Sequence, residues 1–263
     1  MHGAGNCFVL INDMERGIAE EQMSSLAVNL CGKEKVDGLI IVLPPEDADS
    51  DFRMMFFNSD GSIGEMCGNG ARCVARFGYE QGIAKDPQNI RIMTTAGLVT
   101  GRKITDNLYE VRLNDPSVAD IHREVEANGK VYDCSYVELG RPGIPHAVVE
   151  IPIEEIKDCD SLRELGRALR YSSEFSKGAN VTFCAFTDES SVKAITFERG
   201  VEDFTLACGT GCGATAVTMA LRNRLPGSYI IVDMPGGELK VTFSRQGTAI
   251  YNILLTGPTA YME

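Results

Sequence analysis

The sequence predicts an α+β fold of two pseudo-symmetric domains, each a curved, mostly antiparallel sheet or barrel around a central helix. The first observation behind this is an internal duplication: Cys67 and Cys208 lie 141 positions apart, and each opens a Cys-Gly-x-Gly turn with a Phe eleven residues before it. A repeat of that length has the size of a domain, not of a solenoid unit. The second observation is that an apolar helical segment follows each turn directly. Such a helix is expected inside its own sheet.

Short strands outnumber helices along the chain. Segments rich in Val, Ile and Phe and bounded by Gly, Asp and Pro lie at residues 8–11, 38–42, 53–57, 90–94, 108–113, 147–151, 181–186, 194–197, 229–233, 238–243 and 250–256. One amphipathic helix is predicted over 18–30 and is expected to stop at Cys31-Gly32. A second is predicted over 162–169, after a capping box from Ser161 to Glu164. The two central helices are predicted over about 71–81 and 213–224.

Composition restricts the classes of partner. The chain has 263 residues, 44% apolar and 24% charged, which is typical of a globular protein. Its net charge of −12 disfavours nucleic acid and anionic membrane surfaces, and no stretch of consecutive apolar residues is long enough to span a bilayer. We see no signal peptide, and the nine cysteines, an odd number, are expected to be reduced. These observations predict a cytoplasmic protein that binds neither nucleic acid nor membrane.

The two Cys-Gly turns, residues 67–70 and 208–211, carry the chemistry. A strand, a tight turn and a helix leave free backbone N–H groups at the helix N-terminus, which binds anions such as carboxylates. A cysteine placed there should have its thiolate stabilised by the helix dipole. If the duplicated halves face each other, Cys67 and Cys208 flank one ligand from opposite sides. One thiolate can then remove a Cα proton while the opposite thiol delivers another, which inverts the stereocentre.

Three other interpretations of the turns are weighed against this one. A single Cys after a strand is most often a small buried hydrophobe, but here the same turn occurs twice. Zinc is disfavoured because five residues separate Cys67 from Cys73, three separate Cys208 from Cys212, and no His is near. A dinucleotide site is suggested by a relaxed G-x-G-x-x-A after Cys208, but the first turn lacks the third small residue. We therefore expect no metal and no cofactor.

The motifs resemble those of the diaminopimelate epimerase family, which are cofactor-independent isomerases of lysine and peptidoglycan synthesis. The resembling segments span nearly the whole chain in family order: residues 2–6, 37–42, 57–62, 67–72, 145–146, 198–200 and 207–211. The resemblance implies two pseudo-symmetric domains, with the last strand returning to the first domain, and an enzyme without pyridoxal phosphate. We expect one half at 1–114 with 253–263 and the other at 115–252, with the active site in the cleft between them.

The resemblance also implies the roles of individual residues. Cys67 and Cys208 would be the catalytic acid/base pair. The expected substrate-binding residues are Asn6, Asn58, Gly68, Asn69, His146, Asn180, Glu198, Arg199, Gly209 and Thr210. Taken singly, the asparagines could be turn residues, the histidine a satisfied structural side chain and the Glu-Arg pair a solvated one. It is the motif context that favours a functional role for each.

Two departures from the family pattern bear on the substrate. Ile144 stands where the family usually has Asn before Pro-His, and that Asn is expected to bind the far, non-reacting end of diaminopimelate. Cys7 stands where an Asp is usual. The leading prediction is the conversion of LL- to meso-diaminopimelate, with a homodimer as a candidate assembly. The alternatives are a racemase of a single-headed amino acid, an isomerase of a non-amino-acid substrate on the same fold, and a non-catalytic binding protein.

Overall fold

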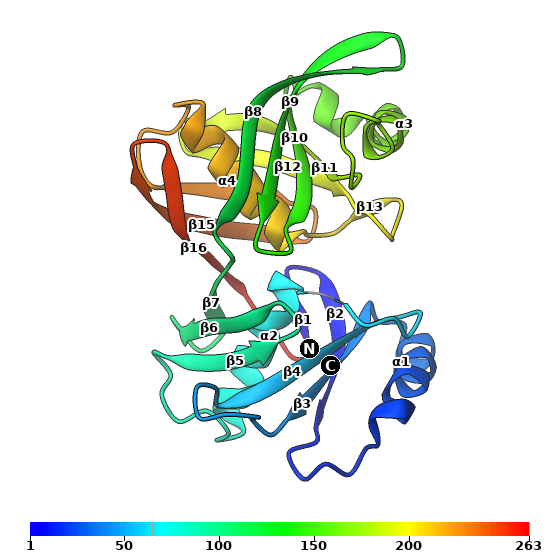
Figure 1. Ribbon diagram of the computed structural model, residues 1–263, viewed down its shortest axis with the longest axis vertical. Helices are drawn as coiled ribbons and strands as arrows, with labels where there is room; N and C mark the ends of the chain where they lie inside the picture. The colour runs from blue at the N-terminus through cyan, green and yellow to red at the C-terminus, as the bar shows by residue number, and fades with distance from the viewer. Residues whose placement is uncertain (65, 263) are drawn as a thin grey trace. The chain divides into compact units, whose positions relative to one another are not determined.

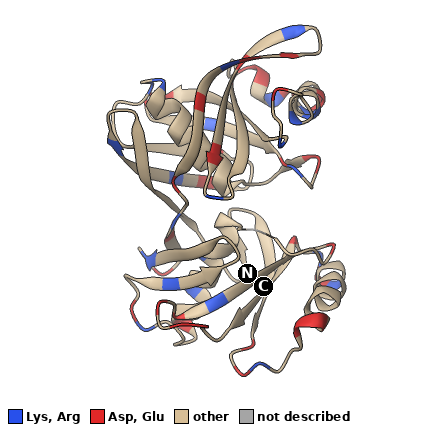
Figure 2. Cartoon of the chain, in the orientation of Figure 1, with Lys and Arg blue, Asp and Glu red and all other residues tan. Residues whose placement is uncertain are grey.

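The computed structural model describes residues 1–64 and 66–262, which form two compact units. The first unit comprises Met1–Arg112 with Thr256–Glu263, and the second comprises Leu113–Leu255 (Figure 1). The N-terminal and C-terminal segments lie together in the first unit, because the backbones of His2 and Ala260 exchange hydrogen bonds of 2.7 and 2.9 Å. Figure 2 shows Lys and Arg interleaved with Asp and Glu along both units.

The first unit is a mixed sheet with two helices. Its elements are β1 (His2–Gly3), β2 (Asn6–Asn12), α1 (Glu20–Glu34), β3 (Gly38–Leu43), β4 (Phe52–Asn58), α2 (Gly68–Glu80), β5 (Ile90–Thr94), β6 (Gly97–Lys103) and β7 (Leu108–Arg112). The strands are paired in sequence order, from β1 to β7. The pairs β2·β3 and β4·β5 are parallel. Parallel neighbours need a crossover connection, and α1 and α2 supply the two crossovers.

The second unit repeats this pattern with a hairpin added at its start. Its elements are β8 (Pro116–Ala127), β9 (Lys130–Leu139), β10 (Ile144–Glu150), a 3₁₀ turn (Glu155–Lys157), α3 (Cys159–Arg170), β11 (Asn180–Asp188), β12 (Ser191–Phe197), β13 (Phe204–Thr205), α4 (Gly209–Leu221), β14 (Tyr229–Met234), β15 (Gly237–Gln246) and most of β16 (Ala249–Pro258). The last residues of β16, from Thr256, belong to the first unit. The parallel pairs are β10·β11, joined through α3, and β12·β14, joined through α4. The matching crossovers confirm the predicted pseudo-symmetry.

The helices α2 and α4 are the central elements of the two units. Every residue of α4 from Gly209 to Ala220 is buried, and α4 contacts β8, β9, β10, β11, β14 and β15. In the same way α2 contacts all seven strands from β1 to β7. The helices α1 and α3 instead bury one face each, through Met23 and Ala27 in the first unit and Leu162 and Leu169 in the second. The α+β fold predicted from the sequence is therefore correct.

Several local predictions need correction. The helix α3 begins at Cys159, and its cap is Asp158, whose carboxylate accepts a 3.3 Å hydrogen bond from the Ser161 backbone N–H. Ser161 is therefore inside the first turn and is not the cap of a capping box. The helix α1 continues through Gly32 to Glu34 and ends at Lys35 in the left-handed conformation. The helix tolerates Gly32 because the buried Cys31 keeps this last turn against the core.

Strand β6, the hairpin of β8 and β9, and the two-residue strands β1 and β13 were not predicted from the sequence. The strand β8 is rich in charged and half-exposed residues, so it lacks the Val-, Ile- and Phe-rich signature that identified the other strands. Its turn nevertheless carries a strong signal. Asn128 and Gly129 adopt φ values of 50° and 73°, as a two-residue hairpin turn requires.

Candidate functional site

The first Cys-Gly turn forms the N-terminus of α2, one turn earlier than predicted. Cys67 is the N-cap residue in an extended conformation, and its sulfur accepts a 3.4 Å hydrogen bond from the Gly70 backbone N–H. A Cβ on Gly70 would approach Cδ1 of Ile40 to 3.0 Å, so glycine lets the turn lie against β3. Cys67 is half-buried, and it therefore combines partial access with the positive end of a helix.

A chain of side-chain hydrogen bonds fixes the amides beside Cys67. The buried guanidinium of Arg72 donates to Oδ1 of Asn69 at 2.8 Å and to the Gly68 carbonyl at 3.3 Å. Asn69 in turn donates through Nδ2 to Oδ1 of Asn6. This arrangement joins three of the predicted binding residues, and it orients both amides. Arg72 was quoted in the motif without a role, and its full burial was not apparent from the sequence.

Asn58 lies in a separate turn at the end of β4. Its Nδ2 donates to Oγ of Ser62 at 2.9 Å, and its backbone N–H donates to the Ser62 carbonyl. Gly61 makes this turn possible with a φ of 84°. These hydrogen bonds hold Asn58 in its own turn, and none of them joins it to the amides beside Cys67.

The second turn forms the N-terminus of α4 in the same way. Cys208 is the N-cap residue, and its sulfur lies 3.6 Å from Oγ1 of Thr210. A Cβ on Gly211 would come within 3.0 Å of the hydroxyls of Thr182 and Thr196, so only glycine fits there. Gly209 is the first residue of the helix and is buried. The duplicated sequence thus produces a duplicated local geometry.

The two thiols differ in their surroundings. Cys208 is only 6% exposed. Burial raises the pKa of its thiol well above the ordinary value, and the negative charge of Glu198 raises it further, against weaker stabilisation by Thr210 and the Gly211 N–H. The expectation that both thiols have a lowered pKa is therefore wrong for Cys208. The helix N-terminus is present, but desolvation of the charged form outweighs it.

The remaining predicted residues of the second unit lie on two adjacent strands and in the turn after β12. His146 on β10 is the register partner of Asn180 on β11. Asn180 accepts a 2.8 Å hydrogen bond through Oδ1 from the Arg199 backbone N–H. Glu198 accepts a 2.5 Å hydrogen bond from Oγ1 of Thr205, which the sequence analysis did not single out. Strand pairing therefore places His146 opposite Asn180, and the hydrogen bond from the Arg199 backbone N–H joins Arg199 to Asn180.

His146 is neutral in this structure. It is fully buried, and neither ring nitrogen has a hydrogen-bond partner within the described part of the chain. Burial, with a contribution from the positive charge of Arg199, lowers the pKa of His146 to about 3. A neutral imidazole can donate through one nitrogen and accept through the other, so it can serve a polar ligand without carrying charge.

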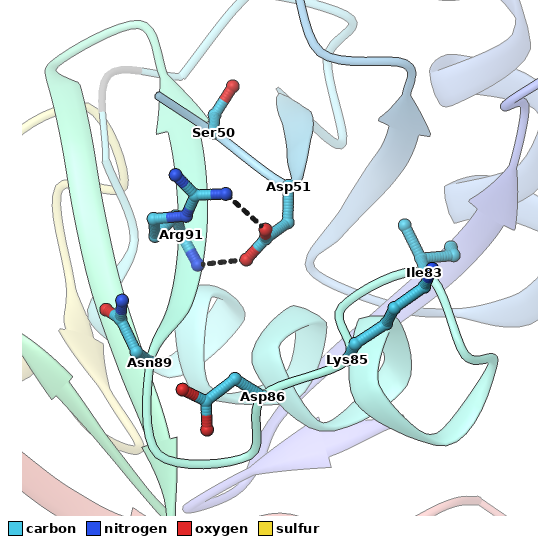
Figure 3. Close-up of a pocket in the computed structure, with 7 residues that line it drawn as sticks. All are labelled: Ser50, Asp51, Ile83, Lys85, Asp86, Asn89 and Arg91. Atoms are coloured by element: carbon cyan, nitrogen blue, oxygen red, sulfur yellow. Dashed lines mark hydrogen bonds and ion pairs between the residues drawn. The ribbon is translucent and has the colours of Figure 1, made fainter. Parts of the chain in front are cut away.

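The two best-defined pockets are lined by other residues. In the first unit, a pocket of about 470 Å³ is lined by Ser50, Asp51, Ile83, Lys85, Asp86, Asn89 and Arg91. Figure 3 shows the Arg91 guanidinium and backbone N–H both directed at the Asp51 carboxylate, each at 2.8 Å. None of these residues belongs to the predicted site. Over residues 1–64 and 66–262, no cluster of three or more His, Cys, Asp or Glu side chains could hold a metal ion.

No described helix is both long and apolar enough to cross a membrane. Comparison with known proteins then decides the family. The family described as diaminopimelate epimerase matches residues 1–116 and 141–262. The diaminopimelate epimerase of Aquifex aeolicus (strain VF5) is 35% identical over 274 residues, covering 98% of this chain and 92% of the relative. The chain belongs to the diaminopimelate epimerase family. This confirms the family and the enzyme class, an isomerase, predicted from the motifs.

Other comparisons agree with this assignment. The diaminopimelate epimerase of Hydrogenobaculum sp. (strain Y04AAS1) is 33% identical, covering 98% of this chain and 93% of the relative. Among solved structures, a PhzF-family phenazine biosynthesis protein of Bacillus anthracis superposes with a TM-score of 0.72 at 15% identity, covering 98% of this chain and 92% of that one. A hydroxyproline epimerase of Agrobacterium vitis gives 0.70 at 18% identity, covering 99% and 89%. These structures confirm the epimerase fold.

The segment that the family does not match is the hairpin region, residues 117–140. It covers most of β8 and all of β9, which are among the strands that were not predicted from the sequence. The matched segments include both Cys-Gly turns and the loop after β12.

Proposed function

We propose that this enzyme interconverts LL- and meso-diaminopimelate by inverting one Cα centre with two thiols. The observation that carries the proposal is the pair of cysteines at matching helix N-termini in a chain 35% identical to a diaminopimelate epimerase over 98% of its length. Each helix end offers backbone N–H groups to the carboxylate next to the reacting carbon. Gly68, Asn69, Gly209 and Thr210 are the residues that we assign to that carboxylate.

The mechanism follows from two thiols on opposite faces of one carbon. In one direction the Cys67 thiolate takes the Cα proton and leaves a carbanion, which the two helix N-termini stabilise through the carboxylate. The protonated Cys208 thiol then gives its proton to the other face and becomes the thiolate. The reverse reaction starts from that state. The raised pKa of Cys208 supports its role as the proton donor in the first direction.

We propose that both thiols act on the same substrate. Asn6, Asn58, Asn180, Glu198 and Arg199 are assigned to substrate contacts, with His146 close to the reacting centre. No pyridoxal phosphate or metal takes part in this proposal. All nine cysteines are free, which supports a reducing, cytoplasmic location. A homodimer is the assembly we propose.

The substrate is tested by incubating the protein with LL-diaminopimelate and with single amino acids, and separating the stereoisomers. We expect meso-diaminopimelate to form from the LL isomer, and slower or undetectable change in the others. Ile144 favours one second candidate, a racemase of a single-headed amino acid, because an apolar side chain cannot hydrogen bond a polar far end. Conversion of a single amino acid but not of diaminopimelate would establish that candidate instead.

A further inference from the structure

A buried carboxylate in the second unit holds a lysine beside Arg199. Glu138 on β9 has a side chain that is only 7% exposed, and its Oε2 accepts a 2.8 Å hydrogen bond from Nζ of Lys177. Its Oε1 accepts a 2.8 Å hydrogen bond from the Tyr136 hydroxyl. Burial works to raise the pKa of Glu138, but the bonds from Lys177 and Tyr136 outweigh it and keep the pKa below its usual value. Glu138 is therefore an ionised anchor.

The same lysine is joined to Arg199 through its backbone. The Arg199 guanidinium donates through Nη1 to the Lys177 carbonyl at 3.3 Å. The Arg199 backbone is itself held by Asn180, as described above. Lys177 and Arg199 are thus two cations fixed in one neighbourhood, one by a side-chain ion pair and the other by two hydrogen bonds.

This neighbourhood adjoins the position of Ile144. A Cβ on Gly143 would lie 2.5 Å from Oε2 of Glu138, the atom that binds Lys177. Pro145 is the register partner of Glu138, and Ile144 is that of Leu139. The lysine ammonium therefore binds the carboxylate oxygen that lies against Gly143, the residue that precedes Ile144.

The positive charges of Lys177 and Arg199 exceed the negative charge of Glu138, so a carboxylate of a ligand can bind there. Glu138 neutralises one of the two cations, and the pKa of Tyr136 is raised to about 12, mainly by burial, so its hydroxyl stays neutral. No carboxylate of the residues that the structure describes forms an ion pair with Arg199. The Lys177 side chain is 54% exposed, and only one of its three N–H donors has a partner among the hydrogen bonds observed.

We propose that Lys177, held by Glu138 beside Arg199, is a specificity-determining residue that binds the carboxylate at the far end of the substrate. The Lys177 ammonium supplies hydrogen-bond donors, which the Ile144 side chain lacks. This inference rests on the proposed function, because it requires a substrate with a second carboxylate. Glu138 acts through Lys177 and is a positioning residue.

The test compares two substrates that differ in that one group. Lysine has the diaminopimelate skeleton without the second α-carboxylate. Lys177→Met removes the ammonium and keeps the chain length, Lys177→Arg keeps the charge, and Lys193→Met is a matched control. Lys193 is a half-exposed lysine of the same unit, 3.8 Å from Asp233. For each variant, kcat and KM for diaminopimelate and kcat/KM for Cα deuterium exchange of lysine are measured.

We expect Lys177→Met to raise KM for diaminopimelate by about ten- to a hundredfold, as for loss of a hydrogen bond to a charged group, with little change in kcat. The exchange of lysine should be unaffected, Lys177→Arg should restore most of the affinity, and Lys193→Met should behave as the unmodified enzyme. An unchanged KM for diaminopimelate, or an equal loss of kcat/KM for both substrates, would overturn this inference and leave the proposed function intact. If the unmodified enzyme does not act on diaminopimelate, the proposed function fails and the inference fails with it.

Discussion

At the scale of single residues, the two thiols of the duplication differ in burial. Cys67 is half-buried, whereas Cys208 is almost fully buried and is subject to the negative charge of Glu198. A helix N-terminus favours a thiolate in both places, but the effect is small compared with burial of the charged form. The same local fold therefore places its two thiols at different burial, and burial together with Glu198 raises the pKa of Cys208.

The influence of Glu198 can be tested directly. Glu198→Gln removes a negative charge that raises the pKa of Cys208, so at a fixed pH below that pKa more thiolate should be present. The rate of Cys208 alkylation by iodoacetamide at pH 8, followed by peptide mass spectrometry, should increase severalfold. The exposed Cys159 serves as the internal control. An unchanged rate at Cys208 would show that Glu198 does not control this thiol.

Replacing either thiol should remove the reaction. Cys67→Ser and Cys208→Ser should each lower the rate of epimerisation by at least about 10²- to 10⁴-fold, since the Ser hydroxyl is a far weaker acid and base at neutral pH. Each variant can still exchange the Cα proton of one stereoisomer, because one thiol remains on one face. Cys159→Ser should have normal activity. Full epimerisation by either of the first two variants would rule out the two-thiol mechanism.

At the scale of elements, the packing of α2 depends on a glycine that the sequence alone does not explain. Gly78 is buried in the last turn of α2, and a Cβ there would lie 2.4 Å from Cε1 of the buried Phe52. Gly32 occupies a comparable place near the end of α1, but nothing lies within 4 Å of its Cβ position. A side chain at position 78 would therefore collide with Phe52, whereas one at position 32 would meet only open space.

Alanine at these two positions should have opposite effects. Gly78→Ala should lower the free energy of unfolding by about 1–3 kcal/mol, because Phe52 must move. Gly32→Ala should raise it by about 0.5–1 kcal/mol, because alanine is a better helix former and meets no obstacle. Urea denaturation of both variants measures the two values. Equal effects would mean that the close approach of α2 to β4 is not as described.

The sequence predicts some elements well and others poorly for identifiable reasons. Segments such as 38–42 were found because a buried strand is apolar throughout, and the turns at Cys67 and Cys208 were found because they repeat. The charged strand β8 was missed, although Asn128-Gly129 marks its turn. Of the site, residue types and spacing could be predicted, but not the burial of Arg72 or the pairing of Glu138 with Lys177. The ion pair joins residues 39 positions apart. The burial of Arg72 depends on the strands that contact α2, so no local pattern encodes either feature.

At the scale of the whole molecule, buried thiols link stability to pH. Burial raises the pKa of Cys134 and of Cys184 to about 12, from an ordinary value of 9.0. Between these values the folded chain keeps protons that the unfolded chain loses, so the free energy of unfolding falls as pH rises. This source of stability is fully present below pH 9.0 and is lost towards about 12.

One substitution isolates this effect. Cys184→Ala removes one such thiol, so the decline of unfolding free energy between pH 9.5 and 10.5 should be less steep by about 1.4 kcal/mol per pH unit. Denaturant unfolding at several pH values compares the slope in the variant with that in the unmodified protein, whatever the difference in stability at neutral pH. Identical slopes would show that Cys184 does not stay protonated in the folded state.

The central claim is that two opposed thiols invert one carbon, and isotope exchange at early times tests it most directly. LL-diaminopimelate is incubated with the enzyme in deuterated water, and both stereoisomers are recovered before a tenth of the substrate has reacted. A proton taken by one thiol on one face cannot return from the other, so we predict that the meso product carries one deuterium at the inverted Cα while the recovered LL isomer carries almost none. Product that retains its original hydrogen, or substrate and product labelled equally fast, would contradict the account.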